Sequence, residues 1–325
     1  MKHWIFIIWV FFSYQMSYSQ VGFQMTQHYM EPFIQNAAFA GTKPCYSLAG
    51  FHHNQWQTIE QAIYSSSISI HKGTNSEGLN SFKNGWHGFG GQIIDDQYAD
   101  IHTLDLSLAY AYHLKVQEHA AVSFGTFVNL KRTNYDESGV RLMDPNDPAF
   151  EERRPVYFFP IISPGFAYYT QSFSVGVSIH NLFKREASSF GNQYGTPADM
   201  NTMVLVSATK RFTYYDYYHI IPSLQLRYDG YFPPSVDMQV TWDYDDLFAA
   251  TLGYRIQDAA IAGFQVRILE RWKIGYAYEY NLSRMRYSGQ HTHELCITFI
   301  SCFKNGGMDP RFYCPAYANA QSTNR

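Results

Sequence analysis

The chain has 325 residues, of which 18% are aromatic and only 16% are charged, and its formal net charge is −3. Ordinary soluble domains carry about 25% charged residues. A disordered chain would combine few aromatic residues with high charge, and a nucleic-acid-binding protein would carry a surplus of cations, so both classes are excluded. The length fits one large domain or two smaller ones.

The N-terminus has the pattern of an export signal. Lys2 and His3 precede an apolar run over residues 4–12, and small and polar residues follow up to Gln20. This run is too short to cross a bilayer as a helix, but it matches the apolar region of a signal peptide. We therefore predict a cleavable signal peptide over residues 1–19 and a mature chain that works outside the cytoplasm.

Apolar and polar side chains alternate with a period of two along most of the remaining chain. In residues 103–114 the even positions are Leu or Tyr and the odd positions are small or polar, and residues 271–281 repeat the pattern. A period of two is typical of strands with two unlike faces. It predicts fourteen strands, most of about the 9–11 residues that a tilted membrane strand needs. Their ranges are 45–53, 63–71, 87–95, 103–114, 119–132, 162–170, 173–183, 202–213, 217–229, 236–245, 247–256, 261–270, 272–281 and 291–301.

The predicted connections alternate in length, which favours a transmembrane antiparallel β-barrel, an all-β fold. Starting from a periplasmic N-terminus, every second connection should be a short turn. Those connections are 115–118, 171–172, 213–217, 245–246 and 270–271, and the connections between them include the long segments 133–161 and 184–201. Residues 72–86 break the rule, because they are long on the side expected to be short. A secreted β-sandwich or propeller is the alternative.

Charged side chains fall on the face that would point into the barrel. A lipid-facing Arg or Lys at mid-depth costs about 2–4 kcal/mol, so the interior is the favourable place for them. Both signs occur in similar number, which favours a cross-linked polar filling over an ion-selective pore. The residues are Asp105, Lys131, His180, Arg227, Asp237, Asp243, Arg255, Arg267, Lys273, Glu279 and Glu294.

No motif of catalytic or cofactor chemistry is present at a recognisable spacing. Zinc-protease, phosphate-loop and G-x-S-x-G patterns are absent. His291 and His293 share a strand face, but no third ligand accompanies them, so we predict no metal site. We expect neither enzymatic activity nor a cofactor, although a barrel lipase with Ser and His from distant strands stays open, since spacing cannot test it.

The chain has four cysteines, Cys45, Cys296, Cys302 and Cys314. An exported protein can form disulfides. Cys296 and Cys302 fall on one predicted strand, roughly 20 Å apart when extended, which is too far for a bond between them. Cys302 could pair with Cys314, or with Cys45, because the first and last strands are neighbours in a closed barrel.

An ordered set of motifs spans most of the mature chain. The opening segment contains Gln27-His28-Tyr29-Met30-Glu31-Pro32 and Asn36-Ala37-Ala38-Phe39-Ala40-Gly41. It is followed by Asn54-Gln55-Trp56, Gly88-Phe89-Gly90-Gly91 with Asp95-Asp96, Asp105-Leu106-Ser107-Leu108-Ala109-Tyr110-Ala111-Tyr112, Asp147-Pro148-Ala149-Phe150 and Val175-Gly176-Val177-Ser178-Ile179-His180-Asn181-Leu182. The set resembles the PorP/SprF family of type IX secretion system membrane proteins. Glu31, Ala37 and Phe39 depart from that family's usual Asn, Pro and Tyr.

The resemblance implies an outer-membrane β-barrel of a gliding or type IX-secreting bacterium. Its implied partners are type IX secretion components, a periplasmic peptidoglycan-binding protein and a large secreted adhesin, together with outer-membrane lipid. The implied function is support of the export or surface attachment of that adhesin by protein–protein contact, without enzyme activity. A porin or small-molecule transporter is the alternative.

We accordingly expect an N-terminal periplasmic segment over residues 20–44, an outer-membrane β-barrel over 45–302 and a C-terminal tail over 303–325. The periplasmic turns and the long outward loops are further contact surfaces. The candidate partner-binding residues are Gln27, Tyr29, Pro32, Asn36, Phe39, Gly41 and Trp56.

Overall fold

The computed structural model describes most of the chain from residue 24 to residue 301. The described ranges are 24–43, 45–56, 63–74, 85–98, 101–117, 120–135, 156–182, 202–215, 217–230, 233–269, 271–282 and 291–301. The expected signal peptide and C-terminal tail lie outside them.

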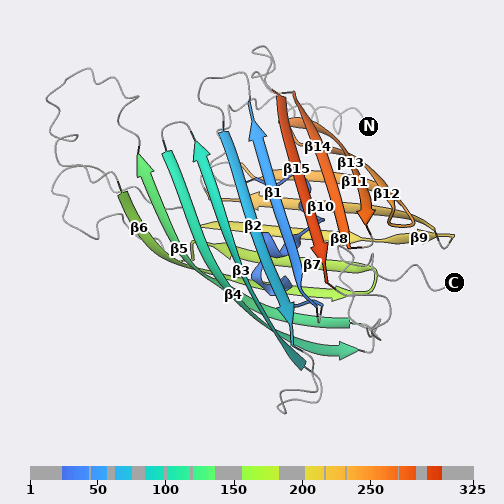
Figure 1. The fold of residues 1–325 in the computed structure, drawn as a ribbon, viewed down its shortest axis with the longest axis horizontal. Helices are drawn as coiled ribbons and strands as arrows, with labels where there is room; N and C mark the ends of the chain where they lie inside the picture. The colour runs from blue at the N-terminus through green and yellow to red at the C-terminus, as the bar shows by residue number, and fades with distance from the viewer. Residues whose placement is uncertain are drawn as a thin grey trace, which may run out of the picture.

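Antiparallel strands in one continuous sheet form nearly all of the regular structure (Figure 1). The strands are β1 (Ser47–Gln55), β2 (Ile63–Gly73), β3 (Gly85–Tyr98), β4 (Ile101–Gln117), β5 (Ala120–Tyr135), β6 (Val156–Thr170), β7 (Phe173–His180), β8 (Met203–Lys210), β9 (Phe212–Tyr214), β10 (Tyr218–Tyr228), β11 (Ser235–Tyr244), β12 (Phe248–Arg255), β13 (Ala259–Leu269), β14 (Trp272–Asn281) and β15 (His291–Ile300). The predicted fourteen strands are confirmed, and β8 and β9 together make up the predicted strand 202–213.

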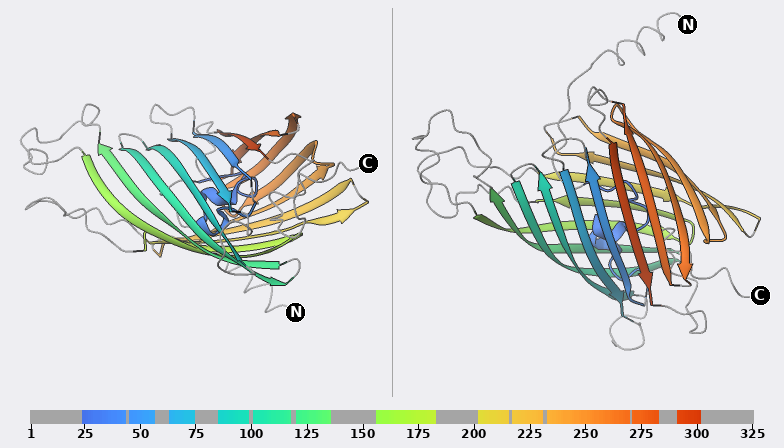
Figure 2. Two further views of the ribbon diagram at one scale, coloured as in Figure 1. Left: turned by 60° about the horizontal axis from the view of Figure 1, so that its bottom comes forward. Right: turned by 45° about the horizontal axis from the view of Figure 1, so that its top comes forward.

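The first and last strands close the sheet into a barrel. β1 pairs with β15 along its whole length, from Ser47 opposite Ile300 to Gln55 opposite Thr292. Each remaining strand pairs with its neighbours in the chain, with β9 continuing β8 along β10. The strands are strongly tilted in all views (Figure 2). The all-β transmembrane barrel expected from the sequence is therefore the fold.

The two faces of the wall differ in the way that the alternating pattern predicts. In β4, Asp105 and Ala111 are buried inside, whereas Leu106 and Leu108 face outward, and Leu108 is 73% exposed. The same outward apolar face continues over the other strands. Such a large exposed apolar surface requires an apolar surrounding, which for a closed barrel is the lipid bilayer.

The charged residues expected to face the interior do so. Asp105, Asp237, Asp243, Arg255, Glu279 and Glu294 are buried, and Lys131, His180, Arg227, Arg267 and Lys273 are half-buried. No helix among the described residues is long and apolar enough to cross a membrane.

Two short connections, from β3 to β4 and from β12 to β13, lie at the end of the barrel where β1 ends and β15 begins. Five short connections lie at the other end, where β1 begins and β15 ends, and we call this the turn end. They join β4 to β5, β6 to β7, β9 to β10, β11 to β12 and β13 to β14. We call the opposite end the loop end. In a membrane barrel of this kind the short turns face the periplasm. Most of the two long segments expected to face outward, 133–161 and 184–201, lies outside the described residues.

Candidate functional site: a segment of the chain inside the barrel

Residues 24–43, which we call the plug segment, lie inside the barrel. They form the blue trace enclosed by the strands in Figures 1 and 2, and every one of them is buried. The sequence had suggested an N-terminal periplasmic segment over residues 20–44. The structure corrects this position for residues 24–43, because their side chains contact the inner wall instead of projecting from the barrel.

Two short 3₁₀ helices make the plug segment compact. The first is η1 (Pro32–Ile34), and Pro32 opens it, where a missing N–H costs nothing. The second is η2 (Ala37–Phe39), and the side chain of Asn36 caps it by accepting a hydrogen bond of 2.9 Å from the N–H of Ala38. The small side chains of Ala37 and Ala38 allow the backbone of η2 to approach the wall, where a Cβ on Gly125 would lie 2.6 Å from it.

Glycines in the wall provide the space that the plug segment fills. A Cβ atom on Gly88 would lie 1.9 Å from the carbonyl oxygen of Ala40, and one on Gly165 would lie 2.0 Å from Oδ1 of Asn36. Gly41 is constrained in turn, because it has a φ of 72° and a Cβ there would lie 2.5 Å from Cα of Gly88. The plug segment therefore packs directly against the backbone of the wall at these glycines.

At the turn end, side chains of the wall bind the carbonyl groups of the plug segment. Nε2 of His113 donates a hydrogen bond of 2.6 Å to the carbonyl of Ala40, and Nδ1 of the same ring lies 2.8 Å from the hydroxyl of Tyr169. The indole of Trp86 stacks on His113 and donates to the carbonyl of Gly41 at 2.9 Å. These bonds satisfy buried carbonyls that would otherwise lack partners.

The middle of the plug segment is held through a carboxylate and an imidazole. The N–H of Gly41 donates to Nδ1 of His71 at 3.0 Å, which leaves Nε2 as the protonated nitrogen facing Oε1 of Glu31 at 3.2 Å. Glu31 is one of the positions that depart from the PorP/SprF signature. In this chain its carboxylate is matched by a histidine of β2, buried with it.

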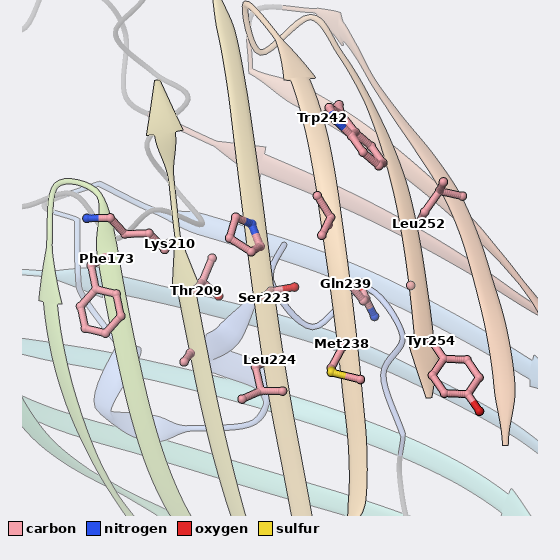
Figure 3. Close-up of a pocket in the computed structure, with 14 residues that line it drawn as sticks. Phe173, Thr209, Lys210, Ser223, Leu224, Met238, Gln239, Trp242, Leu252 and Tyr254 are labelled. Atoms are coloured by element: carbon pink, nitrogen blue, oxygen red, sulfur yellow. The ribbon is translucent and has the colours of Figure 1, made fainter. Parts of the chain in front are cut away.

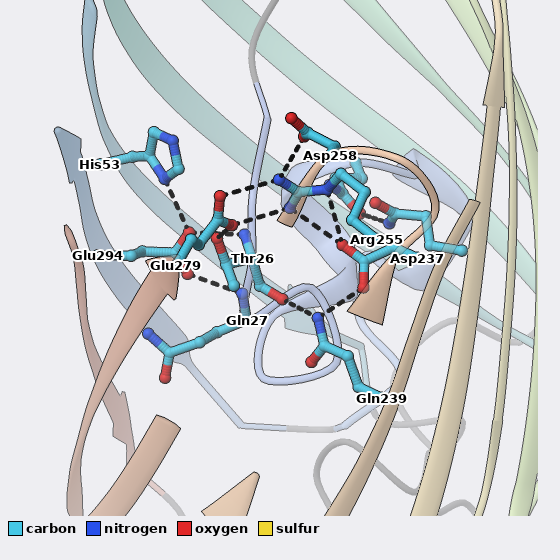
Figure 4. Close-up of polar contacts among 11 residues, drawn as sticks. Thr26, Gln27, His53, Asp237, Gln239, Arg255, Asp258, Glu279 and Glu294 are labelled. Atoms are coloured by element: carbon cyan, nitrogen blue, oxygen red, sulfur yellow. Dashed lines mark hydrogen bonds and ion pairs between the residues drawn. The ribbon is translucent and has the colours of Figure 1, made fainter. Parts of the chain in front are cut away.

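At the loop end, a buried ion network receives the start of the plug segment (Figure 4). The backbone N–H groups of Thr26 and Gln27 donate to the two carboxylate oxygens of Glu294 at 2.6 and 2.7 Å. The Thr26 hydroxyl donates to Glu279, and Nε2 of Gln239 donates to the Thr26 carbonyl at 2.7 Å. One residue thus links to three strands of the wall.

Arg255 is the centre of this network. Its guanidinium contacts Glu279 at 2.8 Å, Asp237 at 3.0 Å and Asp258 at 3.3 Å, and the residue is only 1% exposed. A buried guanidinium needs such partners, because an unpaired buried charge is strongly destabilising. The sequence predicted the inward position of Arg255 but gave no indication that the plug segment would lie against its partners.

Burial also sets the protonation of the plug segment's own ionisable groups. Burial is the main cause that lowers the pKa of the His28 imidazole, and it raises the pKa of the Tyr29 hydroxyl. Both side chains are therefore neutral near pH 7, so neither adds a charge to the interior. The Tyr29 hydroxyl is hydrogen-bonded to Thr251 at 3.1 Å.

A second charged cluster lies at the turn end. Asp246, in the turn between β11 and β12, is within 3.6 Å of Arg211 and 3.4 Å of Arg267, and its N–H donates to Asp243 at 3.0 Å. Lys273 lies 3.8 Å from Asp243. Burial, the largest cause, raises the pKa of Asp246 to about 6.

The structure places six of the seven candidate partner-binding residues together. Gln27, Tyr29, Pro32, Asn36, Phe39 and Gly41 are all buried in the plug segment. Trp56 is separate from them, at the loop end of β1, where its N–H donates to the carbonyl of His291 at 3.1 Å and its φ is 62°. Sequence reasoning missed the wall residues that hold the plug, such as His71, His113 and the glycines.

The histidines considered as metal ligands pair with tyrosines on the outer face. Nδ1 of His291 is 2.6 Å from the Tyr278 hydroxyl, and Nδ1 of His293 is 2.6 Å from that of Tyr276. Within the described part of the chain, no three His, Cys, Asp or Glu side chains are grouped so that they could hold a metal ion.

Two of the four cysteines lie in the described residues. Cys45 is disulfide-bonded, and Cys296 is a buried free thiol. Cys302 and Cys314, the expected partners, are outside the described ranges.

Solved structures similar to this chain are barrels with low sequence identity. The TodX deltaS2S3 mutant monoaromatic hydrocarbon channel has 9% identity and a TM-score of 0.48, with 82% of this chain and 93% of that chain covered. The CymD monoaromatic hydrocarbon channel has 9% identity and a TM-score of 0.45, with 85% and 92% covered. A Pseudomonas aeruginosa FadL homologue has 10% identity and a TM-score of 0.44, with 81% and 93% covered. A search among curated proteins gives no match.

The comparison with family models gives a match over most of the chain. The model described as type IX secretion system membrane protein PorP/SprF matches residues 17–299. This range contains the plug segment and every strand of the barrel except the last residue of β15. The chain therefore belongs to the PorP/SprF family of type IX secretion system membrane proteins, and family and fold together point to the outer membrane.

Proposed function

We propose that this chain is a non-enzymatic barrel of the type IX secretion machinery that supports the export or surface attachment of a large adhesin by protein–protein contact. Membership in a family of secretion-system membrane proteins supports the choice of machinery. The observation that carries the mode of action is the plug segment, whose residues are all buried inside the barrel. A barrel whose interior holds a segment of its own chain is suited to act through its surfaces, because that segment occupies space that a passing solute would need.

The plug segment argues against the alternative of a diffusion porin. Such a channel needs a water-filled lumen. Here the interior contains the apolar side chains of Phe33, Phe39 and Ile34 beside the ion network of Arg255, and each of these residues is at most 2% exposed. We expect solute passage to be hindered as long as the plug segment stays inside.

The exposed turns at the turn end are the surface that we assign to a periplasmic partner. Tyr215, in the turn between β9 and β10, is 87% exposed, more than any other large apolar side chain in the described residues. Aromatic residues are enriched at protein–protein contacts, and loops on rigid scaffolds commonly carry function. The candidate residues of the plug segment, such as Asn36 and Phe39, could meet a partner only if the segment left the interior.

Deleting the gene and comparing the surface proteome tests the proposal. We expect one large adhesin to disappear from the cell surface, while uptake of small solutes is unchanged, and complementation with the intact chain to restore the adhesin. An unchanged surface proteome would contradict the proposal. Reduced solute uptake with a normal surface proteome would favour the porin.

A further inference from the structure

A groove crosses the outer wall of the barrel where the backbone ladder is interrupted. The pairing of β8 with β10 ends at Thr209 opposite Ser223, and pairing resumes only at Phe212 opposite Ile220. Pro222 lies in this gap, and proline has no N–H to donate to a ladder. The N–H of Arg211 bonds instead to the carbonyl of Ser172 at 2.7 Å. The missing N–H of Pro222 therefore accounts for the interruption.

Side-chain sizes deepen this interruption into a groove of about 630 Å³. Small side chains on the outer face, Ala208, Pro222 and Val240, form its floor, and larger ones stand around them. Figure 3 shows Phe173 and Lys210 at one end, and Leu252 and Tyr254 at the other, with Leu224 and Met238 between. The groove spans the neighbouring strands β7 to β12, roughly 19 Å at the usual strand spacing. The groove is open over most of its area, so a bound acyl chain would keep one side in contact with neighbouring lipid.

The polar end of the groove lies at the turn end. Lys210 is the last residue of β8, and its Nζ donates to Oγ of Ser172 at 3.1 Å. The ring of Phe212 is 5.9 Å from the same nitrogen. Aromatic side chains of membrane barrels concentrate at the level of the lipid headgroups. The ammonium group is thus placed where the phosphate of a lipid would lie, and its remaining N–H donors can bind phosphate oxygens.

We propose that this groove is a binding site for one glycerophospholipid of the periplasmic leaflet. An acyl chain lies in the apolar groove over Pro222 and Val240, and the phosphate is bound by Lys210 with Ser172 beside it. The short turns mark the periplasmic end of the barrel, so the lipid comes from that leaflet. This site is independent of the plug segment and of the adhesin-related function.

Native mass spectrometry of the purified full-length mature chain tests the site. The protein is delipidated in mild detergent, phosphatidylglycerol is titrated back, and the bound fraction is measured for four proteins. These are the wild type, Lys210→Gln, Val240→Phe, which fills the groove, and Lys72→Gln. The last is the matched control, since Lys72 is an outward-facing lysine near the turn end of β2 that lies over the ring of Tyr46.

We expect one phosphatidylglycerol to bind to the wild type and to Lys72→Gln with the same affinity. Loss of one charge-assisted hydrogen bond should weaken binding to Lys210→Gln about tenfold. Val240→Phe should weaken it at least as much, with the heat-modifiable electrophoretic migration of a folded barrel retained in all variants. Equal affinity of Lys210→Gln and Lys72→Gln, or unchanged affinity of Val240→Phe, would overturn the proposal, as would a wild type that binds no phosphatidylglycerol.

Discussion

Replacing Asn36 with alanine should loosen the plug segment without disturbing the barrel. Nδ2 of Asn36 donates to the carbonyls of Phe166 at 3.1 Å and Val177 at 3.2 Å, and Oδ1 accepts from Ala38 at 2.9 Å. The amide therefore joins the plug segment to β6 and β7 and caps η2 at the same time. All three bonds disappear in Asn36→Ala.

The expected loss follows from the number of these bonds. Each is worth about 0.5–1.5 kcal/mol net, so the free energy that holds the plug segment in place should fall by about 1.5–4.5 kcal/mol. Every 1.4 kcal/mol is a factor of ten in an equilibrium constant, so the open population should rise roughly tenfold to a thousandfold.

Hydrogen–deuterium exchange of the detergent-purified protein measures this change. The backbone amides of residues 34–41 should lose protection by that factor, whereas the amides of β4 and β5 should keep theirs. Asn129→Ala is the matched control, because Asn129 also faces the interior but donates to Asp105 at 3.2 Å. Unchanged protection of residues 34–41 in Asn36→Ala, or equal loss in the two variants, would refute the assigned role of Asn36.

Three further predictions concern the wall. Arg255→Met should lower the free energy of unfolding by about 3–5 kcal/mol in urea titrations, because it leaves buried carboxylates without their cation; a change below about 1 kcal/mol would contradict the network. Peptide mapping by mass spectrometry should find Cys45 linked to Cys302, since Cys45 is disulfide-bonded and its neighbour Tyr46 accepts a hydrogen bond of 2.9 Å from the N–H of Ser301, with Cys296 alkylated only after unfolding. Burial raises the pKa of the Asp246 carboxyl from 3.8 to about 6. Its contribution to the free energy of unfolding therefore favours the folded state at low pH and is lost as the pH rises from 3.8 to about 6. In urea titrations at several pH values, this part of the pH dependence should vanish in Asp246→Asn.

The strands were predictable because the two faces of the wall meet different surroundings. Leu108 faces outward and Ala109 inward, and the sequence alternates accordingly along β4. Where the residues of both faces are polar, the alternation of apolar and polar side chains is lost and the end of a strand cannot be predicted from it. The predicted third strand ended at Asp95, whereas β3 continues to Tyr98 through Asp96 and Gln97, which lack an apolar face.

The sequence identified the plug segment by its family signature but did not predict that it lies inside the barrel. Its residues match a family signature, yet its contacts are with wall residues far away in the chain, such as Thr26 with Glu294. A single sequence does not reveal contacts across such separations. Glycines such as Gly88 and Gly165 were the available signal, since a glycine within a strand often marks the close approach of another backbone.

Pro222 carried a similar signal within the predicted strand 217–229. A proline is normally excluded from the middle of a sheet, so it indicated an irregularity in the wall. The sequence could not place the interruption on the neighbouring strand, where β8 ends at Lys210 and β9 begins at Phe212.

The most direct test of a barrel closed by its own N-terminal segment is the conductance of the purified mature chain in planar lipid bilayers. The plug segment is held at both ends of the interior, by Glu294 at the loop end and by His113 at the turn end. The wild type should therefore show no steady open channel, and Asn36→Ala should show openings in the same membranes. A large and steady conductance of the wild type would contradict the account.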